Sequence, residues 1–236
     1  MINVLDHGHV RLVDHMGSDL SIARNARVSY DADWRAGEDE GSDSRLIRYL
    51  YRNHHTTPFE AVTFTFDIKA PIFVLRQWHR HRTQSYNELS ARYRPLPAEY
   101  YVPELDQITS QSKDNKQMRT AEQNTNAVRI REIVKDANKA SFALYNEMLD
   151  LGCPRELARS VLPVGTYSHM FATMNLHNLF GFLRLRLHEH AQYEIRVYAQ
   201  AMLDLIEPIV PVAVSAFRES MAWPPSPTSA AEPQSR

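Results

Sequence analysis

The clearest pattern in the chain is a strict alternation of apolar and polar side chains over residues 62–69. Its apolar members are Val62, Phe64, Phe66 and Ile68, and the residues between them are polar. Because successive side chains of a strand point to opposite faces of a sheet, this pattern predicts a β-strand with one face in the core. A weaker alternation over 166–174 predicts another strand, and 2–20 predicts a short strand or two broken by glycines.

Apolar residues at helical spacing predict the helices. We expect them at 20–30, 44–53, 71–80, 130–151, 154–162 and 175–206, the last as one continuous helix. Asp43 is the expected N-cap of the second helix, and Gly152 follows the end of the fourth. Thr57, Pro58 and Glu60 have the spacing of a capping box, which predicts one helical turn there.

Two segments lack this periodicity. Residues 107–126 are polar with almost no apolar side chain, which predicts a long surface loop. The end of the chain is rich in proline, serine and alanine, which is typical of disorder. We therefore expect one domain over 1–220 and a disordered tail over 221–236.

Composition narrows the class of protein. The 236 residues carry a formal net charge of −1, so any anion binding must be local. The single cysteine, Cys153, excludes an intramolecular disulfide and fits a reducing compartment. The first residues show no signal-peptide pattern, and no apolar run approaches the roughly 20 residues of a membrane span. We expect a cytoplasmic protein without membrane contact.

The chemically richest stretch runs from Arg76 to Arg94 and contains five arginines and two histidines against the single acid Glu88. Guanidinium groups bind phosphate oxygens in pairs, and aromatic rings in the same stretch can stack on a planar heterocycle. A charge run is usually a solvated basic face. This one directly follows an apolar run, 71–75, that should anchor it in the core. We interpret it as a binding site for a phosphorylated, planar ligand.

A polar column interrupts the apolar stripe of the predicted last helix. Arg186, His190 and Glu194 are spaced four residues apart and should share one face. Polar groups buried there must be satisfied, since each unpaired group costs several kcal/mol. The column is either a structural Arg–Glu pair bridged by histidine or part of a site.

Metal and thiol chemistry are not expected. The pairs His79/His81 and His188/His190 have a spacing that points their side chains apart on a helix, and arginines crowd both. Nothing but its place before a proline marks Cys153. With seven glycines and no glycine-rich phosphate loop, phosphates must be held by arginine side chains.

The basic stretch resembles the signature of a known enzyme family. Residues 80–93, RHRTQSYNELSARY, match every fixed position of R-H-R-x-x-S-x-N-E-x-S-x-R-Y, the signature of the flavin-dependent thymidylate synthases, or ThyX family. Similarity continues through ARVSY, HHTTPFE, PIFVLRQW, PRELARSVLP and R-x-x-x-HAQ-x-E. The resemblance covers the chain to about Phe217.

The resemblance implies a reaction and an assembly. dUMP would be reductively methylated to dTMP, with 5,10-methylenetetrahydrofolate as carbon donor, NADPH as reductant and FAD as cofactor, without a cysteine nucleophile. The implied fold is α/β, of the α+β type, with a mixed, largely antiparallel sheet and packed helices. The implied assembly is a homotetramer whose active sites lie between subunits.

The resemblance also implies roles for individual residues. Arg186 would stabilise negative charge on the uracil carbonyl, positioned by His190 and Glu194, while Arg92 and Arg159 would hold the phosphate. The expected FAD contacts are Ser29, His55, Thr57, Arg80, His81, Arg82, Glu88, Asn175, His177 and Gly181. The expected dUMP contacts are Gln77, Trp78, His79, Arg80, Glu88, Leu89, Ser90, Ala91, Arg92, Arg159 and Arg186.

Two other functions stay open. A non-enzymatic nucleic-acid-binding module could use 76–94 as a basic, aromatic strip, although the near-neutral overall charge argues against it. An enzyme on the same scaffold could act on a different pyrimidine nucleotide.

Overall fold

A five-stranded antiparallel sheet forms the centre of the protein. The computed structural model describes residues 1–113 and 115–221. The sheet order is β1-β2-β3-β7-β4, and every neighbouring pair is antiparallel. The strands are β1 (Ile2–Val4), β2 (Gly8–Met16), β3 (Thr63–Pro71), β4 (Ser85–Glu88) and β7 (Tyr167–Asn175). The α/β class with an antiparallel sheet is confirmed, but mixed pairing is not observed among the described strands.

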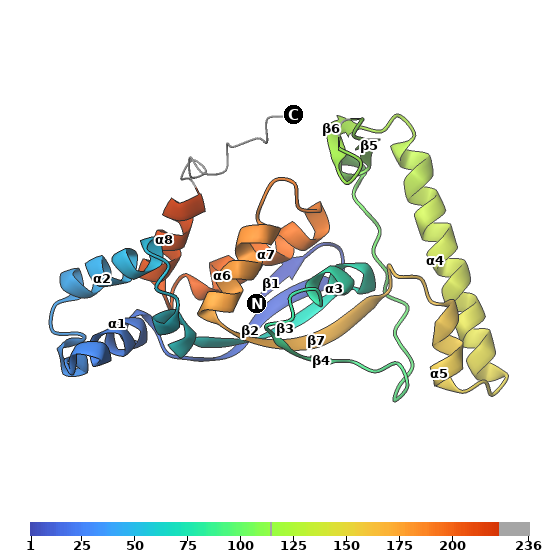
Figure 1. Cartoon of the computed structure of the whole chain (residues 1–236). Helices are drawn as coiled ribbons and strands as arrows, with labels where there is room; N and C mark the ends of the chain where they lie inside the picture. The colour runs from blue at the N-terminus through green and yellow to red at the C-terminus, as the bar shows by residue number, and fades with distance from the viewer. Residues whose placement is uncertain (114, 222–236) are drawn as a thin grey trace, which may run out of the picture.

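One face of the sheet carries the hydrophobic core. Phe64, Phe66 and Ile68 of β3 are fully buried on this face, as the alternation predicts. The helices α3 (Ile72–Trp78), α6 (Leu176–Arg186) and α7 (Tyr193–Ile206) lie over it (Figure 1). The intervening residues of β3 point to the opposite face, where the Thr65 and Thr173 hydroxyls are 2.9 Å apart across the strands.

Further helices lie beyond both ends of the sheet (Figure 1). At one end lie α1 (Asp19–Arg27), α2 (Glu40–Arg52) and α8 (Pro211–Met221), and at the other lie α4 (Ala127–Asp150) and α5 (Arg155–Ala158). The 3-10 turns are η1 (Val28–Tyr30), η2 (Asp33–Arg35), η3 (Thr57–Ala61), η4 (Leu105–Gln107) and η5 (Arg159–Val161). None of the helices in the described ranges combines the length and apolarity needed to cross a bilayer.

The expected start of α2 is wrong. The helix begins at Glu40, and its N-cap is Asp39, whose carboxylate accepts the Ser42 N–H at 3.0 Å. Asp43 is buried instead, where it forms an ion pair with Arg27 at 2.6 Å and accepts the Gly37 N–H at 2.7 Å. Aspartate is a favoured N-cap residue at either position, but only Asp39 has the extended backbone conformation that is typical of an N-cap.

The predicted loop over 107–126 contains structure. Two short strands, β5 (Thr109–Gln111) and β6 (Arg119–Gln123), form an antiparallel hairpin there. The hairpin is anchored by charge rather than by an apolar face, because Arg119 reaches Glu194 of α7 at 2.6 Å. Hydrophobic periodicity therefore does not reveal it.

The continuous helix expected over 175–206 is also wrong. It breaks into α6 and α7, with residues 187–192 forming a turn between them. No proline or glycine marks the break, and each half keeps its own apolar stripe, so periodicity alone predicted one helix. The other expected helices, and the helical turn at Thr57, are confirmed with shifted ends, although no side chain caps that turn. The predicted tail lies outside the described residues except for Met221.

Candidate active site

The signature segment folds around a buried tryptophan. The Trp78 indole stacks on Phe182 of α6 with ring centroids 4.6 Å apart, and its Nε1–H donates to Gln84 at 3.1 Å. The Tyr86 hydroxyl donates to the His81 carbonyl at 2.8 Å. Burial raises the pKa of Tyr86 to about 12, so this donor keeps its proton. These contacts fix the turn between α3 and β4 that carries Arg80, His81 and Arg82.

The Trp78 side chain is fully buried, so it packs beneath the turn that carries Arg80, His81 and Arg82. The place of Trp78 in the dUMP site, which the resemblance implies, stays a prediction. Ala91 is also buried, at 8% exposure. The five arginines of the stretch from Arg76 to Arg94 are exposed, and so is Glu88.

Arg186, at the end of α6, reaches this segment. Its Nε–H donates to His81 Nε2 at 2.9 Å, and its Nη2 donates to the Gln77 carbonyl at 3.1 Å. Since a guanidinium only donates, His81 Nε2 must be the acceptor and the imidazole proton must lie on Nδ1. Burial, with the charge of Arg186 beside the ring, lowers the pKa of His81 to about 4. Burial also lowers the pKa of Arg186.

The predicted polar column does not exist. Arg186 and Glu194 lie on different helices, and Glu194 is buried between Tyr101 at 3.1 Å and Arg119 at 2.6 Å. His190 is exposed and lies 3.5 Å from Glu189. Arg186 is therefore positioned by His81 and Gln77, and not by His190 and Glu194.

Glu88, the acid of the signature, lies at the end of β4. Its carboxylate accepts the Ser168 hydroxyl at 2.6 Å and lies 3.9 Å from His79 Nε2. The next residue, Leu89, donates its backbone N–H to the His169 carbonyl at 2.7 Å. Strand β7 therefore holds this part of the signature in place, and the chain then turns away through Ser90 toward α5.

The two arginines expected to hold phosphate share one partner. Arg92 lies 3.4 Å from the Glu156 carboxylate, and Arg159 Nε donates to the Glu156 carbonyl at 3.3 Å. All three side chains are exposed. Beside them is an open cavity of about 560 Å³, lined by Arg92, Tyr93, Pro95, Leu149, Gly152, Cys153, Pro154, Arg155 and Glu156.

A second hollow, of about 150 Å³, lies between α2 and α6. It is lined by Leu50, Tyr51, His54, His55, Thr56, Phe59, His177, Phe180, Gly181 and Arg184. A Cβ added at Gly181 would meet nothing within 4 Å, so this helix position leaves open space. Three expected FAD contacts, His55, His177 and Gly181, thus lie together. Arg184 is not among the expected contacts, although its spacing from Gly181 and His177 places all three on one helix face.

The remaining expected FAD contacts are divided between these places. Thr57 begins η3 next to the second hollow, and Asn175 caps α6 by accepting the Asn178 N–H at 2.9 Å. Ser29 lies on η1 and is exposed. His81 and its neighbours lie at the other end of α6. His177 and Arg186 are nine positions apart on α6, which is about 14 Å along the helix. One chain therefore presents two separated sets of candidate flavin-binding residues.

Comparison with known proteins gives a consistent result. A family model described as "Thymidylate synthase complementing protein" matches residues 11–212. The flavin-dependent thymidylate synthase of Ehrlichia ruminantium (strain Gardel) is 47% identical over 217 residues, which is 92% of this chain and 72% of that protein. The enzyme of the same name from Wolbachia pipientis wMel is 46% identical over 218 residues, covering 92% of this chain and 75% of that one.

Solved structures show the same similarity. A UMP/dUMP methylase, PolB from Streptomyces cacaoi, bound with 5-Br dUMP, superposes with a TM-score of 0.83 at 38% identity. The match covers 92% of this chain and 97% of that one. PolB bound with 5-Br UMP superposes with a TM-score of 0.82 at 37% identity.

Proposed function

This chain belongs to the family of flavin-dependent thymidylate synthases, and we propose that it converts dUMP to dTMP. In this reaction, 5,10-methylenetetrahydrofolate supplies the carbon, and NADPH supplies two electrons through FAD. The observation that carries the proposal is the complete signature, folded so that Arg186 of α6 meets His81 of the signature. Cytoplasmic location belongs to the same proposal.

The residues present fit a flavin. The hollow at Gly181 combines aromatic walls with Arg184 and three histidines, which suit a planar ring system and phosphate oxygens. Its volume of about 150 Å³ is below the roughly 300 Å³ of a typical ligand pocket, so one chain would hold only part of FAD. When bound, the flavin would supply hydride transfer, which brings the transferred carbon to the methyl level while the folate leaves as tetrahydrofolate.

The phosphate of dUMP would bind at the arginines beside Glu156. Arg92 and Arg159 are exposed, and among the described residues Arg92 forms an ion pair only with the surface residue Glu156. A surface ion pair contributes about 0–1 kcal/mol, so a phosphate dianion can displace it at little cost. The bidentate geometry of arginine then fixes the nucleotide at one end.

Arg186 would act at the uracil ring. Two of its nitrogens are held by His81 and Gln77, and no described residue accepts from its Nη1. That nitrogen can stabilise the negative charge that develops on a carbonyl oxygen as C5 becomes nucleophilic. The C5–carbon bond would then form, the carbon–nitrogen bond that joins this carbon to the folate would break, and the C5 proton would pass to water. His81 keeps its proton on Nδ1, so it offers a neutral donor to the ligand.

A homotetramer with shared sites completes the proposal. The two sets of candidate flavin-binding residues lie at opposite ends of α6, and the phosphate arginines lie beside α5. A second chain that covers these surfaces would bring the missing walls. Several large apolar side chains of α4 and α5 are exposed in the single chain, namely Val128, Ile133, Leu144 and Leu157.

The test is the visible absorption spectrum of the protein after saturation with FAD and removal of the excess. We expect retained oxidised flavin, a spectral change with dUMP, and bleaching by NADPH without oxygen. Arg186→Ala should keep flavin and lose dTMP formation, and Cys153→Ala is the matched control that should keep most activity. Absence of retained flavin together with absence of a dUMP response would refute the proposal, and salt-sensitive single-strand binding would then support a nucleic-acid-binding module.

Methylation of UMP is the second candidate, because PolB has been crystallised with analogues of both nucleotides. The two candidates are separated by supplying dUMP and UMP in equal concentration and measuring both methylated products. A dTMP excess supports the first candidate, and a ribonucleotide product in excess supports the second.

A further inference from the structure

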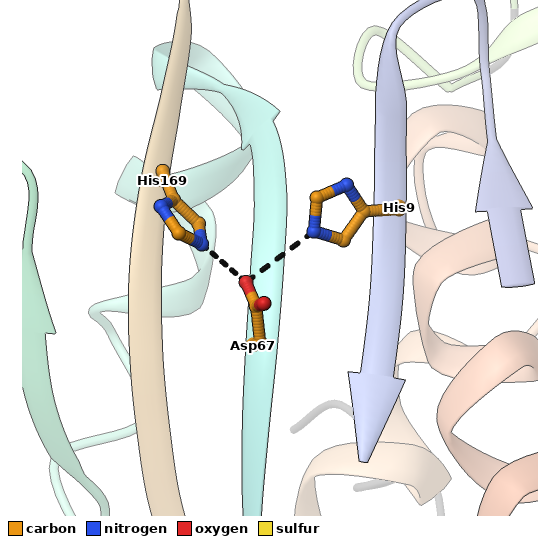
Figure 2. Close-up of side chains that lie close together, drawn as sticks. All are labelled: His9, Asp67 and His169. Carbon is orange, nitrogen blue, oxygen red and sulfur yellow. Dashed lines mark hydrogen bonds and ion pairs between the residues drawn. The ribbon is translucent and has the colours of Figure 1, made fainter. Parts of the chain in front are cut away.

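Two histidines and an aspartate meet on the sheet face opposite the helices (Figure 2). His9 lies on β2, Asp67 on β3 and His169 on β7. Both histidines pair in register with Lys69, on its two sides. Lys69 and Asp67 are two residues apart and share a face, so each imidazole reaches diagonally to the carboxylate. The sheet thus brings together residues that are far apart in the chain, because His9 is 58 positions and His169 is 102 positions from Asp67.

Both imidazoles turn the same atom toward the same oxygen. His9 Nε2 lies 3.3 Å from Asp67 Oδ1, and His169 Nε2 contacts that oxygen too. The three ligand atoms all lie within 4.8 Å of one another. With metal–ligand bonds of about 2.0 Å, neighbouring ligands of a tetrahedral ion are about 3.3 Å apart. We propose that His9, Asp67 and His169 bind one divalent transition-metal ion, for which Zn²⁺ is the best fit.

The ligand set selects this class of ion. Two imidazoles and one carboxylate oxygen suit zinc and its first-row neighbours, whereas magnesium and calcium prefer oxygen ligands throughout. Three protein ligands leave a fourth tetrahedral position for water. Asp67 is 4% exposed and both histidines are partly buried, so the carboxylate side of the ion would be shielded from solvent.

Arg11 orients the carboxylate without occupying the ligand oxygen. Its Nε and Nη2 donate to Asp67 Oδ2 at 3.0 and 2.6 Å, which leaves Oδ1 to the histidines. Such outer contacts are usual around metal-binding carboxylates. Lys69 is paired with Glu99 at 2.7 Å. Asp67 and Glu99 balance the charges of Arg11 and Lys69, so the ligands and these neighbours together carry no net charge, as the ligands of three-histidine zinc centres do.

The site lies next to the signature in the fold. The His169 carbonyl accepts the Leu89 N–H, and the neighbouring Ser168 hydroxyl donates to Glu88. An ion that ties β7 to β3 and β2 would therefore stiffen the strand that holds Glu88 and Leu89. This role needs neither flavin nor nucleotide.

The test is calorimetric titration of Zn²⁺ into the full chain after removal of metal by a chelator. We expect one ion per chain, a rise in Tm on binding, and the visible spectrum of tetrahedral Co²⁺ when cobalt replaces zinc. Loss of an outer contact typically weakens metal binding 10–100-fold, and loss of a ligand should cost no less, so His9→Ala and His169→Ala should each weaken binding at least about tenfold. These changes leave the Asp67–Arg11 pair intact.

Two controls separate this site from surface histidines. His15→Ala, on the same strand, should leave binding unchanged, because that ring stacks on Phe64 instead. The rings of His188 and His190 lie 4.7 Å apart, so the double alanine variant of this pair tests adventitious binding. The proposal is overturned by absence of one-to-one binding, by unchanged affinity in both ligand variants, or by loss confined to the 188/190 variant. None of these readouts depends on dTMP formation.

Discussion

Replacing His81 by glutamine should remove one source of acid sensitivity from the protein. Glutamine can still accept the Arg186 Nε–H through its side-chain oxygen, but it cannot take up a proton. In the native protein the pKa of His81 is lowered from 6.5 to about 4, by burial first and by Arg186 second. The unfolded chain therefore binds a proton at a higher pH than the folded chain does. The contribution of His81 to the free energy of unfolding is therefore fully present above pH 6.5, and it is lost as the pH drops toward 4.

The size of the effect follows from the shift. A change from 6.5 to about 4 corresponds to about 3 kcal/mol once the pH is below both values. The ring is only half-buried, so solvent screening reduces this to about 1–2 kcal/mol. At pH 5 most of the reduced loss should already be present.

Urea denaturation at pH 7.5 and pH 5.0 measures the loss. We expect the native protein to lose about 1 kcal/mol more than His81→Gln does between the two values. Titration of the imidazole by NMR gives the pKa directly, and Arg186→Gln should raise it. Equal losses in the two proteins, or an imidazole that titrates near 6.5, would refute the proposed neutral acceptor.

Three further changes test other parts of the structure. Arg119→Ala leaves Glu194 buried with only Tyr101, which should cost about 3 kcal/mol in urea denaturation, and no loss would show that the hairpin does not anchor this acid. Gly8→Ala places a Cβ 2.0 Å from the Tyr198 hydroxyl and against two carbonyls, so Tm should fall by an amount equivalent to about 3 kcal/mol, and an unchanged Tm would contradict the packing. Arg92→Lys should weaken dUMP far more than FAD, because a bidentate fork is lost, and equal weakening of both would count against its place at the phosphate.

The extent to which sequence predicts this fold varies between elements. Strand β3 and the end of α4 at Gly152, where φ is +79°, follow from alternation and from left-handed backbone chemistry. The break between α6 and α7 does not, because the partners that fix it, His81 for Arg186 and Arg119 for Glu194, are remote in the chain. Hydrophobic periodicity carries no information about such polar partners.

The candidate site was predicted in its residue types and only partly in its arrangement. The signature identifies the residues, but it does not say that Trp78 is buried or that His81 is neutral, since both depend on Phe182 and Arg186 of another helix. The cluster of His9, Asp67 and His169 has no local spacing at all. Only the register of three strands brings it together.

The pairing of β3 with β7 also has a consequence for synthesis on the ribosome. Strand β3 ends at Pro71 and its partner begins at Tyr167. At 5–20 residues per second, the ribosome needs roughly 5–20 s to make the chain between them. During this interval a strand that carries the core residues Phe64, Phe66 and Ile68 has an open edge, which is the kind of surface that other chains can pair with. Nascent chains of this protein are therefore expected to depend on chaperone protection until the second half has emerged.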